Sequence, residues 1–233
     1  MLFWIAQMVK FRIRDRVKMR AAITQREVID KYGMPTDVLE AAYVRYFEQL
    51  DITLRPISNF SLNPTKDLEQ LDLLILTGGG SVPAVYYGDG KAVEEQKNRD
   101  RTEKILLEYC FSRGIPVLAI CRGMQYINGL LGGRVRYLHN ARTIRKDHAV
   151  RLCRENRTIQ VNHYHDDGIL RNDLAPGLTA EAVDETCGSV EAFSMKEKRL
   201  LAVQWHPERP FEVAEHRLDT DLMIKEFLFC RKG

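Results

Sequence analysis

Short apolar runs alternate with amphipathic segments along the first half of this chain, and the alternation predicts strands followed by helices. Four apolar runs are typical of strands; they are residues 20–24, 52–57, 71–77 and 115–120. Apolar residues recur at helical spacing in residues 36–50, 92–113 and 121–131. Strands that alternate with helices indicate an α/β fold, with a mostly parallel sheet flanked by helices and ligands bound outside the carboxyl ends of its strands.

The second half carries further short strand-like runs and one last helix. The runs are residues 148–152, 158–162, 181–183, 190–193 and 200–204, and the helix is residues 219–229. At 233 residues the chain is long enough for one sizeable α/β domain and marginal for two. We therefore expect residues 19–233 to form a single domain.

Residues 1–18 do not fit this pattern. Their apolar stretch is nine residues long, well short of the roughly twenty residues that cross a bilayer. Basic residues follow the stretch instead of preceding it, which argues against a secretory signal. Two interpretations stay open: a surface extension, or an upstream start codon with Met19 as the true beginning.

Charge and cysteine content exclude some classes of function. The chain has 35 basic and 32 acidic residues, a balance too even to argue for binding to nucleic acid or to a membrane surface. Its five cysteines lack CxxC spacing, so we expect no metal site of that kind and a location in the reducing cytoplasm.

Cys121 stands at the corner between the predicted strand of residues 115–120 and the helix that follows. A cysteine at a helix N-terminus sits among unpaired backbone N–H groups at the positive end of the helix dipole, which favours the thiolate. A tight turn from strand to helix needs small flanking residues, and Ala119 and Gly123 supply them. The pattern is that of a nucleophile elbow, although a free cysteine is more often a small residue of the core.

Gly78, Gly79 and Gly80 directly follow the apolar residues 71–77. Consecutive glycines allow backbone N–H groups to face a ligand with no side chain in the way, as in an oxyanion site or a phosphate nest. The alternative is a tight turn that binds nothing. No GK[ST] sequence follows, which excludes a P-loop.

His206 and Glu208 lie at the end of the last strand-like run, on either side of Pro207. In an extended segment residues i and i+2 project to the same face, so the two side chains are predicted to lie side by side. A carboxylate next to an imidazole fixes its tautomer and supports its positive charge, and the imidazole can then exchange a proton with a thiol. Taken alone, such a triplet is more often an exposed turn.

Seven motifs occur in order along residues 20–230. They are ITQR at 23–26, LTGGGSVPAVYYG at 76–88, RDRTE at 99–103, PVLAICRGMQYINGLLGG at 116–133, VNHYH at 161–165, VEAF at 190–193 and VQWHPE at 203–208. In this order they resemble the class I glutamine amidotransferase-like superfamily. More closely, they resemble its γ-glutamyl hydrolase (peptidase C26) branch, which includes the γ-glutamyl-γ-aminobutyrate hydrolases.

The resemblance implies a flavodoxin-like α/β fold and cleavage of a γ-glutamyl amide through a thioester, with no metal or organic cofactor. It implies a catalytic triad of Cys121, His206 and Glu208. It also implies an oxyanion hole made by the N–H of Arg122 and an N–H of Gly79 or Gly80.

Two more residues are expected to bind substrate by the same resemblance, Gln125 and His165. Gln125 matches the position that contacts the γ-glutamyl group; otherwise it would be a solvent-facing helix residue. His165 belongs to a loop that borders the leaving-group side of the pocket. Asp166 and Asp167 replace the family's His-Gln in that loop, and with Gly168 they also make an ordinary turn sequence.

The leaving group stays open. Residues 23–43 look like the subset of the family found with sugar and capsule modification, which includes hydrolases of γ-glutamyl nucleotide phosphoramidates such as γ-glutamyl-CDP-amidate. In that case Arg122, Arg134 and Arg136 are candidates to offer charge to a nucleotide, or else they are solvated neighbours of the elbow.

The expected partner is a small-molecule γ-glutamyl substrate, and the sequence leaves open whether the chain forms a homodimer. One alternative function is a glutaminase subunit that delivers ammonia to a partner synthetase. Another is a binding module without catalytic activity, which the presence of Cys121, His206 and Glu208 argues against.

Overall fold

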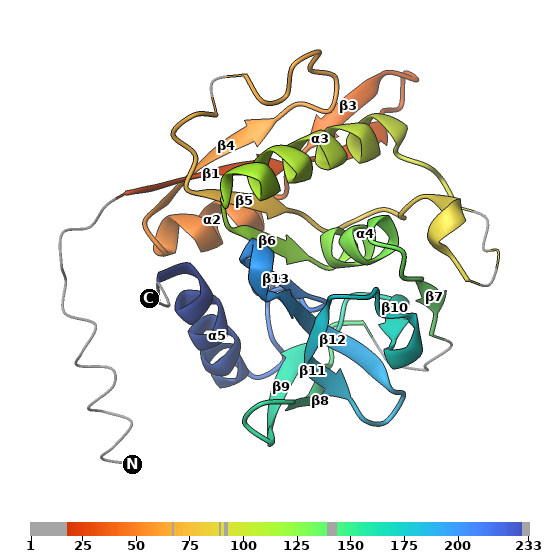
Figure 1. Cartoon of the computed structure of the whole chain (residues 1–233), viewed down its shortest axis with the longest axis vertical. Helices are drawn as coiled ribbons and strands as arrows, with labels where there is room; N and C mark the ends of the chain where they lie inside the picture. The colour runs from red at the N-terminus through yellow and green to blue at the C-terminus, as the bar shows by residue number, and fades with distance from the viewer. Residues whose placement is uncertain (1–17, 67, 89, 91–92, 139–143, 230–233) are drawn as a thin grey trace.

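The computed structural model describes residues 18–66, 68–88, 90, 93–138 and 144–229. Of the predicted extension at residues 1–18, all but the last residue lies outside this range. Parallel strands form one half of a mixed sheet (Figure 1). In spatial order they are β4 (Ile52–Ile57), β1 (Met19–Thr24), β5 (Leu73–Leu76), β6 (Val117–Ile120) and β13 (Leu200–Val203).

The sheet continues beyond β13 with antiparallel strands. They are β12 (Ser189–Met195), β11 (Thr179–Asp184), β8 (Asp147–Leu152) and β9 (Arg157–Asn162). Off this path, β10 (Asp167–Leu170) pairs with β12 and with β7 (Arg136–Tyr137). The antiparallel order follows from the short connections in this part of the chain, because parallel neighbours need a long crossover.

Two layers of helices cover the parallel strands. α2 (Ala41–Gln49) and α5 (Arg217–Phe229) contribute to the core on one face, and α3 (Lys97–Arg113) and α4 (Arg122–Leu130) to the core on the other. Along β5, Leu73 and Ile75 belong to the first core, and Leu74 and Leu76 to the second. This alternation is what the two-residue period of a strand requires when both faces are buried.

The predicted helix at residues 36–50 is wrong at its start. Pro35–Val38 forms a strand, β3, which pairs with β2 (Arg26–Ile29), and α2 begins only at Ala41. Asp37, inside the predicted helix, instead accepts hydrogen bonds from the side chains of Ser58 and Asn59, each over 2.6 Å. These partners lie about twenty residues away, so no local pattern could show them.

The predicted helix at residues 92–113 begins at Lys97 and ends as expected, with Gly114 in the left-handed region at φ 66°. None of the helices in the described part of the chain is long and apolar enough to cross a membrane. Cys110, Cys121, Cys153 and Cys187 all have free thiols.

Candidate active site

Cys121 forms the predicted elbow between β6 and α4. Its backbone has φ 52° and ψ −106°, a sparsely populated conformation for a residue with a side chain and one that clusters at functional sites. Gly123 allows α4 to pack against β5. A Cβ at this position would lie 2.7 Å from the Cβ of Leu76 and 2.8 Å from its carbonyl oxygen, so the small flanking residue expected from the sequence is required.

His206 and Glu208 are in contact, as predicted, with 2.6 Å between Nδ1 and Oε1. The predicted extended geometry is wrong, because β13 ends at Val203 and a turn follows. In this turn the N–H of Arg209 donates to the carbonyl oxygen of His206 over 3.1 Å. Asn162 holds the turn, since its Oδ1 accepts the His206 N–H over 2.9 Å and its Nδ2 donates to the His206 carbonyl over 2.8 Å.

The surroundings of His206 favour its charged form. Burial by itself disfavours the imidazolium, but the Glu208 carboxylate and the Cys121 sulfur outweigh it and raise the pKa of His206 to about 10. A hydrogen bond with Cys121 contributes to this rise. Nδ1 is engaged by Glu208, so Nε2 is the nitrogen left for the sulfur. By contrast, burial raises the pKa of the Cys110 thiol to about 12, which keeps it protonated and inert.

Residues 78–80, which we call the glycine loop, lie directly against Cys121 and His206. A Cβ on Gly78 would lie 2.6 Å from Cε1 of His206 and 3.2 Å from Cβ of Cys121. The Gly78 N–H donates to the hydroxyl of Tyr43 over 2.9 Å. Gly79 and Gly80 have φ of 81° and 77°, the region that glycine adopts without strain, and both line the cavity beside Cys121.

Arg99 binds the backbone of the glycine loop through hydrogen bonds. Its guanidinium donates to the carbonyl oxygens of Thr77 over 2.6 Å and of Gly79 over 2.7 Å, and to the carboxylate of Glu103 over 2.8 Å. Glu103 also accepts from Arg122 over 2.6 Å. Arg99, Glu103 and Arg122 are fully buried, so this ion network ties the loop to the start of α4.

No role was predicted for Arg99 and Glu103 beyond their place in a motif, although an Arg/Glu pair four residues apart is visible in the sequence. The prediction that Arg122 offers charge to a nucleotide is wrong, because its side chain is buried against Asp100 and Glu103. The backbone N–H of Arg122 lies at the start of α4, directly after Cys121, as the predicted oxyanion hole requires. Arg136 pairs with Asp173 over 2.5 Å, and neither it nor Arg134 lines the cavity.

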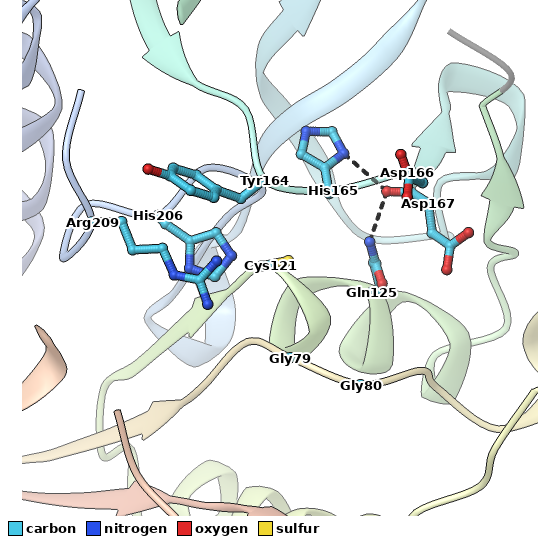
Figure 2. Close-up of a pocket in the computed structure, with 10 residues that line it drawn as sticks. All are labelled: Gly79, Gly80, Cys121, Gln125, Tyr164, His165, Asp166, Asp167, His206 and Arg209. Carbon is cyan, nitrogen blue, oxygen red and sulfur yellow. Dashed lines mark hydrogen bonds between the residues drawn. The ribbon is translucent and has the colours of Figure 1, made fainter. Parts of the chain in front are cut away.

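A cavity of about 180 Å³ opens beside Cys121 (Figure 2). It is smaller than the roughly 300–1,000 Å³ of sites for drug-sized ligands, so it suits a small group. Gln125 and His165, both predicted to bind substrate, line it and share a partner. Gln125 donates to the carbonyl oxygen of Asp167 over 2.9 Å, and Nδ1 of His165 lies 3.0 Å from the same oxygen. Gln125 is buried and does not face solvent.

Asp166 and Asp167 also line the cavity, and Asp167 begins β10. The loop around them therefore borders the site, as the resemblance implied. Burial lowers the pKa of His165, which favours a neutral ring in the cavity wall.

Two lining residues were missed from the sequence. The guanidinium of Arg209 lies 4.9 Å from the ring centre of Tyr164 and pairs with Glu40 over 2.7 Å. The Tyr164 ring in turn lies edge-on to His206, with 5.7 Å between centres. Arg209 directly follows the HPE triplet, and this was the only signal that could have suggested it.

The mixed α/β sheet with its flanking helices, in which Cys121 forms the elbow, has the fold of glutamine amidotransferase structures. A glutamine amidotransferase from Thermotoga maritima has the same fold, with a TM-score of 0.59 and 20% identity over 90% of this chain and 84% of that chain. The chain belongs to the peptidase C26 family, whose model matches residues 24–208. It is thus a C26-type amidohydrolase within the class I glutamine amidotransferase-like superfamily, as the motifs predicted.

The chain is also similar to curated proteins from other organisms. The glutamine amidotransferase-like protein YvdE of Lactococcus lactis is 33% identical over 172 residues, which cover 64% of this chain and 70% of that protein. Protein NtpR of Enterococcus hirae is 31% identical over 166 residues, which cover 60% of this chain and 68% of that protein.

Proposed function

We propose that this protein is a γ-glutamyl hydrolase that cleaves a γ-glutamyl amide through a thioester on Cys121. The observation that carries the proposal is the arrangement around one imidazole. The Cys121 sulfur contacts the ring of His206 on one side, and Glu208 binds its Nδ1 over 2.6 Å on the other. Such a pair forms a nucleophile with its general base, oriented by a third group.

In the first step the Cys121 thiolate adds to the γ-carbonyl carbon, and the carbonyl electron pair moves to the oxygen. The N–H of Arg122 and an N–H of Gly79 or Gly80 stabilise this oxyanion. Gly78 is unsuitable because its N–H is bound to Tyr43. The oxyanion then collapses, the C–N bond breaks, and the leaving nitrogen takes the proton of the His206 imidazolium.

In the second step neutral His206 accepts a proton from water as the water oxygen adds to the thioester carbon. The C–S bond breaks, glutamate leaves, and the thiolate–imidazolium pair is restored. Glu208 stabilises the imidazolium and keeps Nε2 directed at the sulfur throughout.

The cavity suits the two charges of a glutamyl group. Arg209 offers a guanidinium for the α-carboxylate, and Asp166 offers a carboxylate for the α-ammonium. Figure 2 shows Gln125 on the same side of Cys121 as Asp166, with Arg209 on the other side. Gln125 lies one helical turn past the nucleophile, where its amide can contact the glutamyl chain.

The leaving group is proposed to lie outside this small cavity. Candidate substrates are γ-glutamyl-γ-aminobutyrate and a γ-glutamyl nucleotide phosphoramidate such as γ-glutamyl-CDP-amidate. The same site chemistry would also hydrolyse glutamine if the chain served a partner synthetase.

The test is glutamate release from glutamine, γ-glutamyl-γ-aminobutyrate and γ-glutamyl-CDP-amidate, each with the wild type and with Cys121→Ser. Cys153→Ser is the matched control, because Cys153 is a free thiol outside the cavity. We expect turnover of at least one conjugate in excess of glutamine, a loss of at least about 10³-fold in Cys121→Ser, and no loss in the control. Turnover of glutamine alone would favour the synthetase subunit, and equal activity in Cys121→Ser would refute the mechanism.

A further inference from the structure

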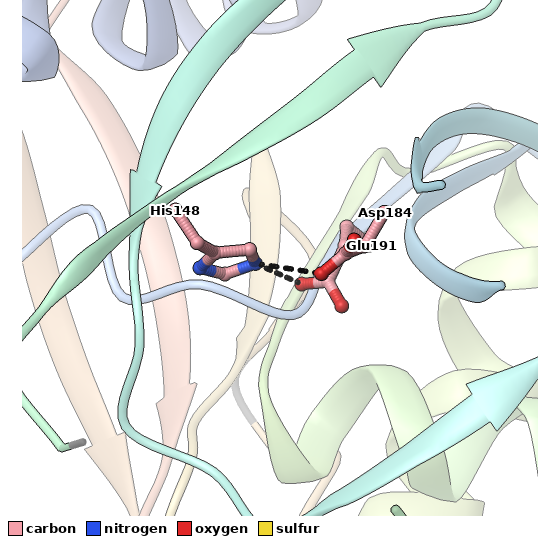
Figure 3. A group of neighbouring side chains, drawn as sticks. All are labelled: His148, Asp184 and Glu191. Carbon is pink, nitrogen blue, oxygen red and sulfur yellow. Dashed lines mark ion pairs between the residues drawn. The ribbon is translucent and has the colours of Figure 1, made fainter. Parts of the chain in front are cut away.

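His148, Asp184 and Glu191 gather around a common point (Figure 3). They come from β8, from the end of β11 and from β12. One ligand-type atom from each lies within 4.8 Å of the others. None of them belongs to the site described above.

The distances within this cluster are too long for hydrogen bonds. Nε2 of His148 lies 3.8 Å from Oδ2 of Asp184 and 3.7 Å from Oε2 of Glu191. Neither ring nitrogen of His148 makes a hydrogen bond, although only 9% of the side chain is exposed. A buried polar group without a hydrogen bond is costly, and a water molecule or an ion can supply the partner.

Each carboxylate is held by its other oxygen. Oδ1 of Asp184 accepts from the N–H and the hydroxyl of Thr186 over 2.8 and 2.6 Å. Oε1 of Glu191 accepts from the hydroxyl of Ser189 over 2.6 Å. Hydrogen bonds of this kind orient the carboxylates that bind metals, and here they direct Oδ2 and Oε2 to the common point.

His165 supplies a fourth donor. Its Nε2 lies 3.7 Å from Oε2 of Glu191 and makes no hydrogen bond, and 3% of its side chain is exposed. Its Nδ1 lies 3.0 Å from the carbonyl oxygen of Asp167, which can only accept, so Nδ1 carries the proton. In the neutral ring, Nε2 then presents a lone pair towards a carboxylate, an unfavourable contact that a cation between them would reverse.

A β-bulge sets the direction of Glu191. On β12, Ala192 pairs with Ala182 and Val190 pairs with Val183, so Glu191 is the extra residue. Bulges of this kind re-aim a side chain and occur near functional sites.

We propose that His148, His165, Asp184 and Glu191 bind one divalent transition-metal ion, with Zn²⁺ as the best fit. Zinc accepts imidazole and carboxylate ligands at about 2.0–2.2 Å in a tetrahedron, which places neighbouring donor atoms about 3.4 Å apart. The observed separations of 3.7 and 3.8 Å need to contract by only a few tenths of an ångström. His165 is not among the residues whose ligand atoms all lie within 4.8 Å of one another, so its ring would have to move towards His148 and Asp184 when the ion binds.

The ion would have a structural effect on the active site. His165 lines the substrate cavity with one edge of its ring and would bind metal with the other. Metal binding would therefore fix the wall that carries Asp166 and Asp167, and it would join β8, β11 and β12 to that wall. The motif resemblance implied no metal, so this site is an addition to it.

The first measurement is the metal content of the untagged full chain by plasma mass spectrometry, after expression with added zinc and gel filtration. We expect about one zinc per chain in the wild type and below about 0.2 in His148→Ala and Glu191→Gln. His216→Ala is a matched control, a histidine paired with Asp147 outside the cluster. Cys121→Ser is a second control, because a thiol beside an imidazole is another zinc-binding pair; both controls should keep the metal.

The second measurement does not depend on the variants. After removal of metal from the wild type by a chelator, Zn²⁺ at about 1,000 times its dissociation constant should raise Tm by roughly 8 °C or more. Co²⁺ should give the visible bands of a tetrahedral site. A wild type without bound metal and without a Tm shift overturns the proposal. Metal retained in both cluster variants, or lost in Cys121→Ser, also overturns it, whatever the result for γ-glutamyl hydrolysis.

Discussion

Oε1 of Glu208 lies 2.6 Å from Nδ1 of His206 inside a turn, and the backbone of that turn is fixed by Asn162 from a different strand. The imidazole is thus oriented from two directions, by a carboxylate on its ring and by an amide on its backbone. These contacts set the orientation of the ring relative to Cys121, which is the pre-organisation that proton transfer requires.

Glu208→Gln should lower the pKa of His206, because the carboxylate, together with the Cys121 sulfur, raises that pKa to about 10 in the wild type. In the proposed mechanism the free enzyme needs the imidazolium, so wild-type kcat/KM should fall only as the pH rises through about 10. In the variant this alkaline limb should move to lower pH, and kcat should fall by about 10²–10⁴-fold. A pH–rate profile with Glu212→Gln, a surface carboxylate, as control checks this; an unmoved limb would contradict it.

Gly78→Ala should impair activity more than stability. The added methyl group would meet Cε1 of His206 at 2.6 Å and displace the ring, so we expect kcat/KM to fall by about 10²-fold. Gly177→Ala is the control, because Gly177 has φ of 83° and open space around it. It should cost about 1 kcal/mol of unfolding free energy and leave kcat/KM unchanged. Equal kinetics for the two variants would disprove the role assigned to the glycine loop.

Arg99→Ala should destabilise the fold by about 3–5 kcal/mol, since it removes one of the two guanidinium groups that pair with the buried Glu103 carboxylate and takes the donor from the Thr77 and Gly79 carbonyl oxygens. Lys104→Ala breaks another pair at the same spacing on the same helix, with Glu108, but 55% of the Lys104 side chain is exposed. It should change the unfolding free energy by about 0–1 kcal/mol. Urea unfolding followed by circular dichroism measures both, and similar losses would mean that burial of the network is unimportant.

Arg209→Met should raise KM and leave kcat nearly unchanged, because the guanidinium is proposed to bind the α-carboxylate in ground state and transition state alike. Glu40→Gln separates this effect from a structural one. It removes the charge that pairs with Arg209 over 2.7 Å and keeps the guanidinium in the cavity. Steady-state kinetics should show a higher KM in Arg209→Met only; the same rise in Glu40→Gln would indicate that the pair merely holds the loop.

The sequence alone determined the parallel half of the sheet and the elbow. Runs such as Val117–Ile120 are apolar on both faces. Strands of this kind can be predicted from the sequence because each one is a continuous apolar run. Cys121 could be assigned because its flanks, Ala119 and Gly123, carry the local steric requirement of the turn. His206 and Glu208 could be paired because they are only two residues apart.

The tertiary structure decided everything that depends on distant partners. It made Pro35–Val38 a strand because β2 lies beside it, and it turned Arg122 inward because Asp100 and Glu103 are buried behind it. It also brought His148 to Glu191, from separate strands, around one point. Hydrophobic periodicity predicts which face of a helix or strand is buried. Which charged side chains meet on that face depends on the order of the strands, and the pattern does not contain this order.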